Sequence, residues 1–157
     1  MIAAVLALVF AMPAGWEHVT VDNPPGSTVE MLDIGRGPTI QGFQQQINVL
    51  RHQLTDPAIS ISAWADQSVT YLQSHGDAHV LASHAERLCN GTHDGWWIES
   101  TGTYSERKLD LVQVALLDNG YEYVATYSRP DGTDFDVAAV KALDSLCPAT
   151  QGENNAP

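Results

Sequence analysis

The stretch KLDLVQVALLDNGYEYVATYS, residues 108–128, contains two runs of strand-forming residues separated by Asn119-Gly120. Asn-Gly between two such runs supplies the positive φ angles of a two-residue type I′ turn. We therefore predict an antiparallel hairpin with strands at 108–117 and 121–128. Apolar residues occupy both parities of the first strand, which indicates a central strand covered on both faces of its sheet.

Further strands are predicted on both sides of this hairpin, because short runs of alternating apolar and polar residues end at Gly, Pro, Asn or Asp. Gly35-Arg36-Gly37-Pro38 is expected to close one of these strands as a turn. Consecutive strands should pair antiparallel, since the connections between them are short. The predicted strands span residues 16–21, 28–34, 43–54, 78–89 and 96–103.

One helix is predicted between the strands, where Ile61, Ala65, Val69 and Leu72 fall at helical spacing. Ser60 or Ser62 can cap its start, because a serine oxygen accepts a hydrogen bond from the first free helical N–H groups. Gly76 is expected to end the helix.

A second helix is predicted near the end of the chain, with an apolar stripe running from Val137 to Cys147. Asp134 or Asp136 can cap it, and Pro148 ends it. The order of these elements predicts an α+β fold, a mainly antiparallel sheet sandwiched by two helices.

The composition limits the partners of the chain. Its 157 residues, with 44% hydrophobic and 17% charged side chains, are enough for one globular domain, which we place at residues 15–148 with a disordered tail at 149–157. The net charge of -12 would repel phosphate backbones, so nucleic acid is not an expected partner. No segment approaches the roughly 20 apolar residues of a membrane span.

Residues 1–14 are predicted to be a secretory signal. Ile2 to Met12 is an unbroken apolar run, and Pro13-Ala14-Gly15 follows it as a break beside small residues. Cleavage after Ala11 or Ala14 would satisfy the small-residue preference of the signal peptidase. No Lys or Arg precedes Arg36, so the charged start of a signal is missing, and the alternative is a buried first element of the domain.

The two cysteines, Cys89 and Cys147, are predicted to form a disulfide, because an exported chain matures in an oxidising space. The bridge would close a loop of about 57 residues and stabilise the fold by about 4 kcal/mol. The alternative is two separate buried thiols. We expect a periplasmic or secreted location.

Several features together resemble the PsbP-like and DcrB-like group of exported bacterial proteins. They are the Gly15-Trp16 strand, the strand at 43–54 leading into a helix, the turn and strand Asp94-Gly95-Trp96-Trp97, and Tyr123–Tyr127 before a last helix. The resemblance implies an α/β/α sandwich and a non-enzymatic accessory role, with no catalytic residues to carry over. The chain lacks the lipidated cysteine of the lipoprotein members.

Four histidines fall within nineteen residues and suggest a metal or catalytic centre: His75, His79, His84 and His93. Zinc binds imidazole and carboxylate groups in tetrahedral sets. His79 and His84 are five positions apart, however, so on one strand they face opposite sides of the sheet. We therefore expect solvated or hydrogen-bonded histidines and no metal. A secreted enzyme using the His75–His93 region with acidic neighbours is the alternative.

Trp96 and Trp97 are the candidate contacts for a ligand or protein partner, since Trp is enriched in binding hot spots. As neighbours on a strand they must point to opposite faces, and burial beneath helices is the favoured alternative. Glu99 with Asp110 is a weaker candidate for a carboxylate pair. Asn90-Gly91-Thr92 fits the glycosylation triplet.

The sequence as a whole predicts an exported, monomeric binding or accessory module of the cell envelope, not an enzyme, without a cofactor. Its expected partner is an unknown protein or small ligand. A purely structural partner subunit is the third alternative, and it would show an exposed apolar patch and no concave pocket.

Overall fold

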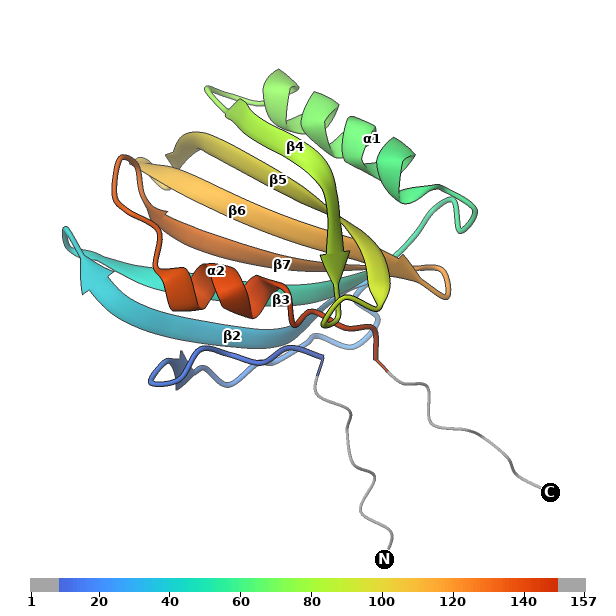
Figure 1. Ribbon diagram of the computed structural model, residues 1–157, viewed down its shortest axis with the longest axis horizontal. Helices are drawn as coiled ribbons and strands as arrows, with labels where there is room; N and C mark the ends of the chain where they lie inside the picture. Colours follow the sequence, from blue (N-terminus) through green and yellow to red (C-terminus); the bar gives the residue numbers. More distant parts are fainter. Residues whose placement is uncertain (1–8, 150–157) are drawn as a thin grey trace, which may run out of the picture.

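The computed structural model describes residues 9–149, which form one seven-stranded antiparallel sheet with two helices packed on it (Figure 1). The strand order across the sheet is β1-β2-β3-β7-β6-β5-β4. In chain order the elements are β1 (Glu17–His18), β2 (Val29–Ile40), β3 (Phe43–Gln53), α1 (Ile61–Ser74), β4 (His79–Leu88), β5 (His93–Tyr104), β6 (Arg107–Asp118), β7 (Tyr121–Pro130) and α2 (Val137–Leu143).

The predicted hairpin is present as β6 and β7. Asp118 pairs with Tyr121, and the two loop residues have φ angles of 49° at Asn119 and 80° at Gly120, as a type I′ turn requires. Residues of both parities are buried along β6, which confirms that this strand is covered on both faces. The middle position of the sheet belongs to β7, because β3 pairs with its other edge.

The predicted sandwich of helices is wrong. The fold is mostly antiparallel sheet, and helices make up 15% of it. The reason is the size and placement of the helices: α2 has 7 residues, about 10 Å at 1.5 Å per residue. Seven strands at about 4.8 Å spacing make a sheet roughly three times wider. α1 is longer, but it packs mainly against β4 and β5.

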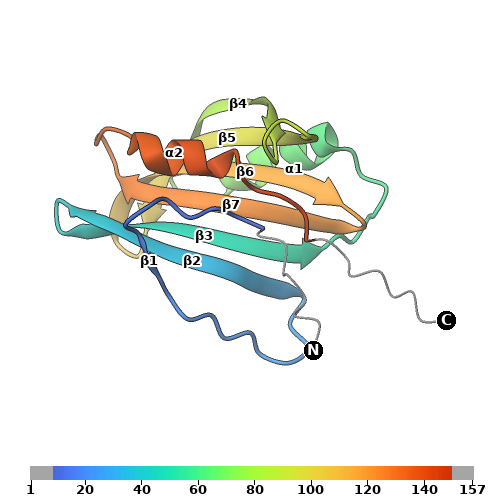
Figure 2. The ribbon, with the colours of Figure 1, turned by 60° about the horizontal axis from the view of Figure 1, so that its bottom comes forward.

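The main core lies on the face of the sheet that carries α2. Alternate residues of β3, β7 and β6 point into it, because side chains alternate between the two faces of a strand. The N-terminal segment, residues 9–16, runs along the same side of the sheet as α2 and supplies Phe10 and Trp16 to this core (Figure 2). This segment has no regular structure, but it covers part of the sheet that two helix layers were expected to cover. The fully buried residues of the main core include Ile47, Val49, Val112, Val114, Leu116, Tyr127, Leu143 and Leu146.

Gly35-Arg36-Gly37-Pro38 lies within β2 and is not the predicted turn. Its two glycines are sites of close approach. A Cβ at Gly35 would overlap the Met12 sulfur, and one at Gly37 would overlap the Trp16 indole. Gly35 and Gly37 therefore let the N-terminal segment lie directly against the strand.

The helix starts follow the predicted capping. Ser60 Oγ accepts the Ala63 N–H at 3.1 Å, and Asp136 Oδ1 accepts the N–H groups of Ala138 and Ala139. α2 ends at Leu143, four residues before the predicted end, and a turn at 144–145 follows it. β1 is also shorter than the predicted strand.

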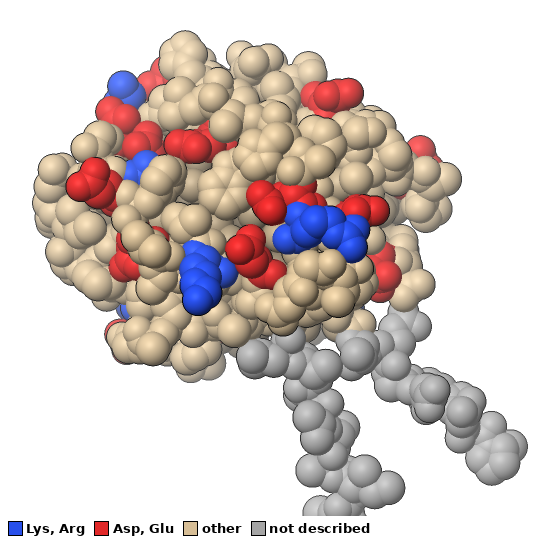
Figure 3. Space-filling model, viewed as in Figure 1, with Lys and Arg blue, Asp and Glu red and all other residues tan. Residues whose placement is uncertain are grey.

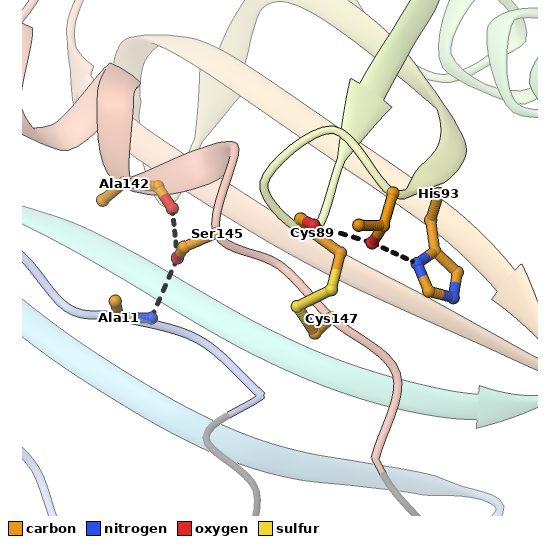
Figure 4. Close-up of a disulfide and its surroundings, with 7 residues drawn as sticks. Ala11, Cys89, His93, Ala142, Ser145 and Cys147 are labelled. Carbon is orange, nitrogen blue, oxygen red and sulfur yellow. Dashed lines mark hydrogen bonds between the residues drawn. A yellow bond between two sulfur atoms is a disulfide. The ribbon is translucent and has the colours of Figure 1, made fainter.

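The predicted disulfide is present between Cys89, directly after β4, and Cys147, four residues after α2 (Figure 4). The two Cα atoms are 4.6 Å apart, within the usual range for a bridge. The N-terminal segment is fastened to the same region, because Cys147 N donates to Val9 O at 2.8 Å and Ala11 N donates to Ser145 Oγ at 2.9 Å. The two described ends of the chain are thus tied together.

The predicted signal falls partly outside the described residues, which begin at Val9. Within residues 9–14, Phe10 is only 2% exposed. Most of the predicted tail, 150–157, also lies outside the described part. In residues 9–149, neither helix is long and apolar enough to span a bilayer.

Candidate functional site

A cleft with a volume of about 760 Å³ lies between α1 and the sheet, on the face opposite the main core. Leu50 and His52 of β3 pair with Val124 and Glu122 of β7, so these four side chains point to the same side. Because α1 packs mainly on β4 and β5, this part of the face has no helix directly upon it. The volume is in the range of small-molecule sites, roughly 300–1,000 Å³.

The wall of the cleft opposite the sheet comes from α1 and the segment that leads into it. Leu54 N donates to Gly120 O at 2.8 Å, which holds the start of this segment against the β6–β7 turn. On α1, Trp64, Ser68 and Tyr71 are spaced at i, i+4 and i+7, so they share the helix face toward the cleft. The apolar lining is completed by Leu50, Leu54, Ile59, Leu72 and Val124.

Glu122 is the centre of a polar cluster inside this mostly apolar lining. Its Oε1 lies 2.9 Å from His52 Nδ1, and its Oε2 accepts a hydrogen bond from Trp64 Nε1. The Glu122 side chain is 17% exposed and that of His52 is 35% exposed. The Glu122 carboxylate thus links β7 to β3 and to α1, and it still lines the cleft.

This cleft was not predicted from the sequence. His52 and Glu122 are separated by seventy positions, and only the register between β3 and β7 makes them neighbours. The helical spacing of Trp64, Ser68 and Tyr71 was the available signal, because it places two aromatic rings along one side of α1.

The four candidate histidines do not form a shared site. The His75 ring stacks on Tyr71 with centroids 3.9 Å apart, and His93 Nδ1 lies 2.9 Å from Thr92 Oγ1. His84 stacks on Trp97. Across residues 9–149, no group of three His, Cys, Asp or Glu side chains is placed to hold a metal ion.

The argument that His79 and His84 face opposite sides was wrong. Their partners on β5 are Thr101 and Trp97, which have the same parity, so both histidines point to the same face. A bulge between Val80 and Ala82 inserts one extra residue into β4 and reverses the alternation. Their partners on β5 are four residues apart, so at about 3.3 Å per residue the two histidines are still about 13 Å apart along the strand.

Trp96 and Trp97 point to opposite faces as predicted, and each is partly buried. Trp97 packs against the main core, whereas Trp96 lies on the α1 side and donates from Nε1 to Ser83 Oγ at 2.9 Å. Neither lines the cleft described above. Their suggested role in ligand or partner contact remains a prediction.

The Glu99 and Asp110 candidates are on the α2 face, but Asp110 is already engaged. Its Oδ2 lies 3.3 Å from Arg129 Nη2, and both side chains are less than a tenth exposed. Asn90 of the glycosylation triplet lies in an exposed turn next to the disulfide. Nearby, burial and the Glu86 carboxylate raise the pKa of Asp144.

The charged side chains are mostly acidic, 19 Asp and Glu against 7 Lys and Arg. On the face that carries α2, Asp and Glu side chains are scattered and only a few Lys or Arg side chains lie between them (Figure 3). Among the described residues, four Lys or Arg side chains are held in ion pairs: Arg51 with Glu30, Arg87 with Asp94, Lys108 with Asp131 and Arg129 with Asp110.

No family model and no curated protein matches this chain. Solved structures share its fold, among them PA94 and LpqN. PA94 from Pseudomonas aeruginosa, a protein of unknown function, has a TM-score of 0.59 at 10% identity over 87% of this chain and 99% of that one. LpqN from Mycobacterium tuberculosis, involved in cell envelope biogenesis, has a TM-score of 0.52 at 12% identity over 87% and 91%. The comparisons support the architecture, and the PsbP-like resemblance is not confirmed by them.

Proposed function

We propose that this protein is an exported binding module of the cell envelope that holds a mainly apolar small molecule in the cleft between α1 and strands β3, β7 and β6. The observation that carries the proposal is the cleft, an apolar lining interrupted by one polar cluster at Glu122. Sites of this kind bind a ligand by its apolar surface and orient it by the few polar groups.

Location outside the cytoplasm is supported by two observations. The disulfide between Cys89 and Cys147 belongs to an oxidising compartment, since thiols are kept reduced in the cytosol. The fold is shared with LpqN, which is involved in cell envelope biogenesis. Both agree with the predicted export of this chain.

The alternative of a secreted enzyme finds less support. Three histidines of the 75–93 region make local contacts, His75 with Tyr71, His93 with Thr92 and His84 with Trp97. In the described part of the chain, no three His, Cys, Asp or Glu side chains are grouped so that they could hold a metal ion. A binding role needs only the cleft.

The test is a titration with N-phenyl-1-naphthylamine, an uncharged apolar probe that fluoresces when it leaves water. We expect saturable binding, which Ser68→Phe should weaken at least tenfold by filling the cleft. Thr70→Phe, on the exposed side of the same helix, is the matched control and should bind like the parent protein. Absence of saturable binding, or equal binding by the Ser68→Phe variant, would refute the proposal.

A further inference from the structure

The charges that line the cleft all have the same sign. Glu122 and Asp56 are its acidic members, and among its described lining residues there is no Lys or Arg. The one nitrogen base in the lining is His52, and its Nδ1 already faces Glu122 Oε1. An anionic head group would therefore meet two carboxylates with no Lys or Arg beside them.

Glu122 retains capacity to bind a further donor. Each carboxylate oxygen has two lone pairs, and in this structure Oε1 faces His52 while Oε2 accepts from Trp64. The side chain is mostly buried but not closed off, at 17% exposure. An electrostatic contact made here is screened less than one on the open surface.

One aromatic ring contacts this carboxylate, and a second lines the same cleft. Trp64 donates directly to Glu122, and Tyr71 follows two turns along α1, with one side of its ring against His75. An ammonium group is attracted both to a carboxylate and to the face of an indole or phenol ring. Acidic and aromatic groups without a Lys or Arg side chain are the complement of a cation.

We propose that the ligand of the cleft is a cationic amphiphile, with an apolar chain along the wall formed by Leu50, Leu72 and Val124 and an ammonium head at Glu122. This inference rests on the binding function proposed above and adds the charge of the ligand. The net charge of -12 favours the approach of such a molecule.

The experiment compares three amphiphiles with the same twelve-carbon chain, each below its critical micelle concentration: dodecyltrimethylammonium, dodecyl maltoside and laurate. Calorimetry on the full chain should give at least tenfold tighter binding of the ammonium compound than of laurate, with the maltoside between them. Glu122→Gln keeps the size and one acceptor oxygen, but it replaces the other oxygen by an amide NH2 group and removes the charge. It should abolish the preference for the ammonium compound over laurate.

Glu99→Gln is the control for general attraction to an acidic protein, because Glu99 pairs with Val112 on the other face of the sheet. It should leave all three affinities unchanged. Equal binding of laurate and the ammonium compound, or equal effects of Glu122→Gln and Glu99→Gln, would overturn the inference while leaving the cleft as a site. If Ser68→Phe reduces none of the three affinities, the proposed function itself fails.

Discussion

Replacing Phe10 with alanine is expected to destabilise the protein by about 3–5 kcal/mol, the usual cost of removing a buried aromatic ring from a core. Phe10 is 2% exposed and packs in the main core on the α2 face, in a segment held by the hydrogen bond from Cys147 N to Val9 O. For a domain of this size such a loss lowers Tm by about 10 °C.

Urea unfolding of the two proteins measures this effect as a lower free energy of unfolding in water. The slope of that free energy against urea concentration should be the same for both proteins. Val137→Ala is the matched control, since Val137 is 80% exposed and should change stability by less than about 0.5 kcal/mol. A change of less than 0.5 kcal/mol for Phe10→Ala would show that the N-terminal segment is not part of the folded core.

The same reasoning bears on export. The two predictions for the start of the chain differ here, because a signal cut after Ala11 or Ala14 would remove Phe10, whereas a buried first element of the domain would keep it. Since Phe10 is buried in the core, we expect the mature protein to keep Val9–Trp16. A chain lacking residues 1–14 should be less stable than one lacking residues 1–8, which keeps Phe10. Mass spectrometry of the protein from its native host would contradict this if the mature chain began at Met12 or Gly15. Urea unfolding would contradict it if the two shortened chains unfolded at the same urea concentration.

Cys89→Ser with Cys147→Ser should lower the free energy of unfolding by about 2–4 kcal/mol, and the parent protein should titrate no free thiol when unfolded without reductant. Arg129→Met should cost about 3–5 kcal/mol in thermal unfolding because it leaves the buried Asp110 carboxylate unpaired, whereas Arg129→Met with Asp110→Leu should restore much of the loss. The Thr103 hydroxyl and N–H groups hold the pKa of Asp77 below its usual value. The ionised Asp77 carboxylate therefore stabilises the fold above its unfolded pKa, and this stabilisation is lost as the pH falls through the lower folded pKa. The difference in unfolding free energy between the parent and Asp77→Asn should shrink below about pH 4. A difference that does not change with pH would refute this role of Asp77.

Local signals in the sequence predicted the elements and one long-range link. Asn119-Gly120 has no good alternative to a tight turn between two strands, and Ser60 and Asp136 cap helices by contacts within a few residues. The disulfide could be predicted from the sequence because two cysteines allow only one pairing. These features depend on neighbours in the chain or on simple elimination.

The errors have physical causes that no local pattern shows. Gly35 and Gly37 were interpreted as a turn, but they are needed because Met12 and Trp16 pack against that strand. The bulge after Val80 put His79 and His84 on one face, and a bulge depends on how β4 matches β5. The sandwich was expected because helix coverage was assumed from element order, although part of the covering comes from an irregular segment.

The candidate site was missed for a similar reason. His52 and Glu122 meet through the register of β3 against β7, a pairing between the first hairpin and the last strand. Neither residue lies in a recognisable motif. The aromatic face of α1 was visible in the sequence, but without the register nothing indicated which part of the sheet it would face.

Nuclear magnetic resonance of the four tryptophan indole N–H groups during titration with N-phenyl-1-naphthylamine tests the binding role of the cleft most directly. Trp64 alone among them lines the cleft, whereas Trp16 packs in the main core and Trp96 and Trp97 lie on β5. The predicted result is a saturable change in the chemical shift of the Trp64 signal, with the other three signals unchanged. A change in the chemical shift of Trp97 without one of Trp64, or no change of any signal, would contradict it.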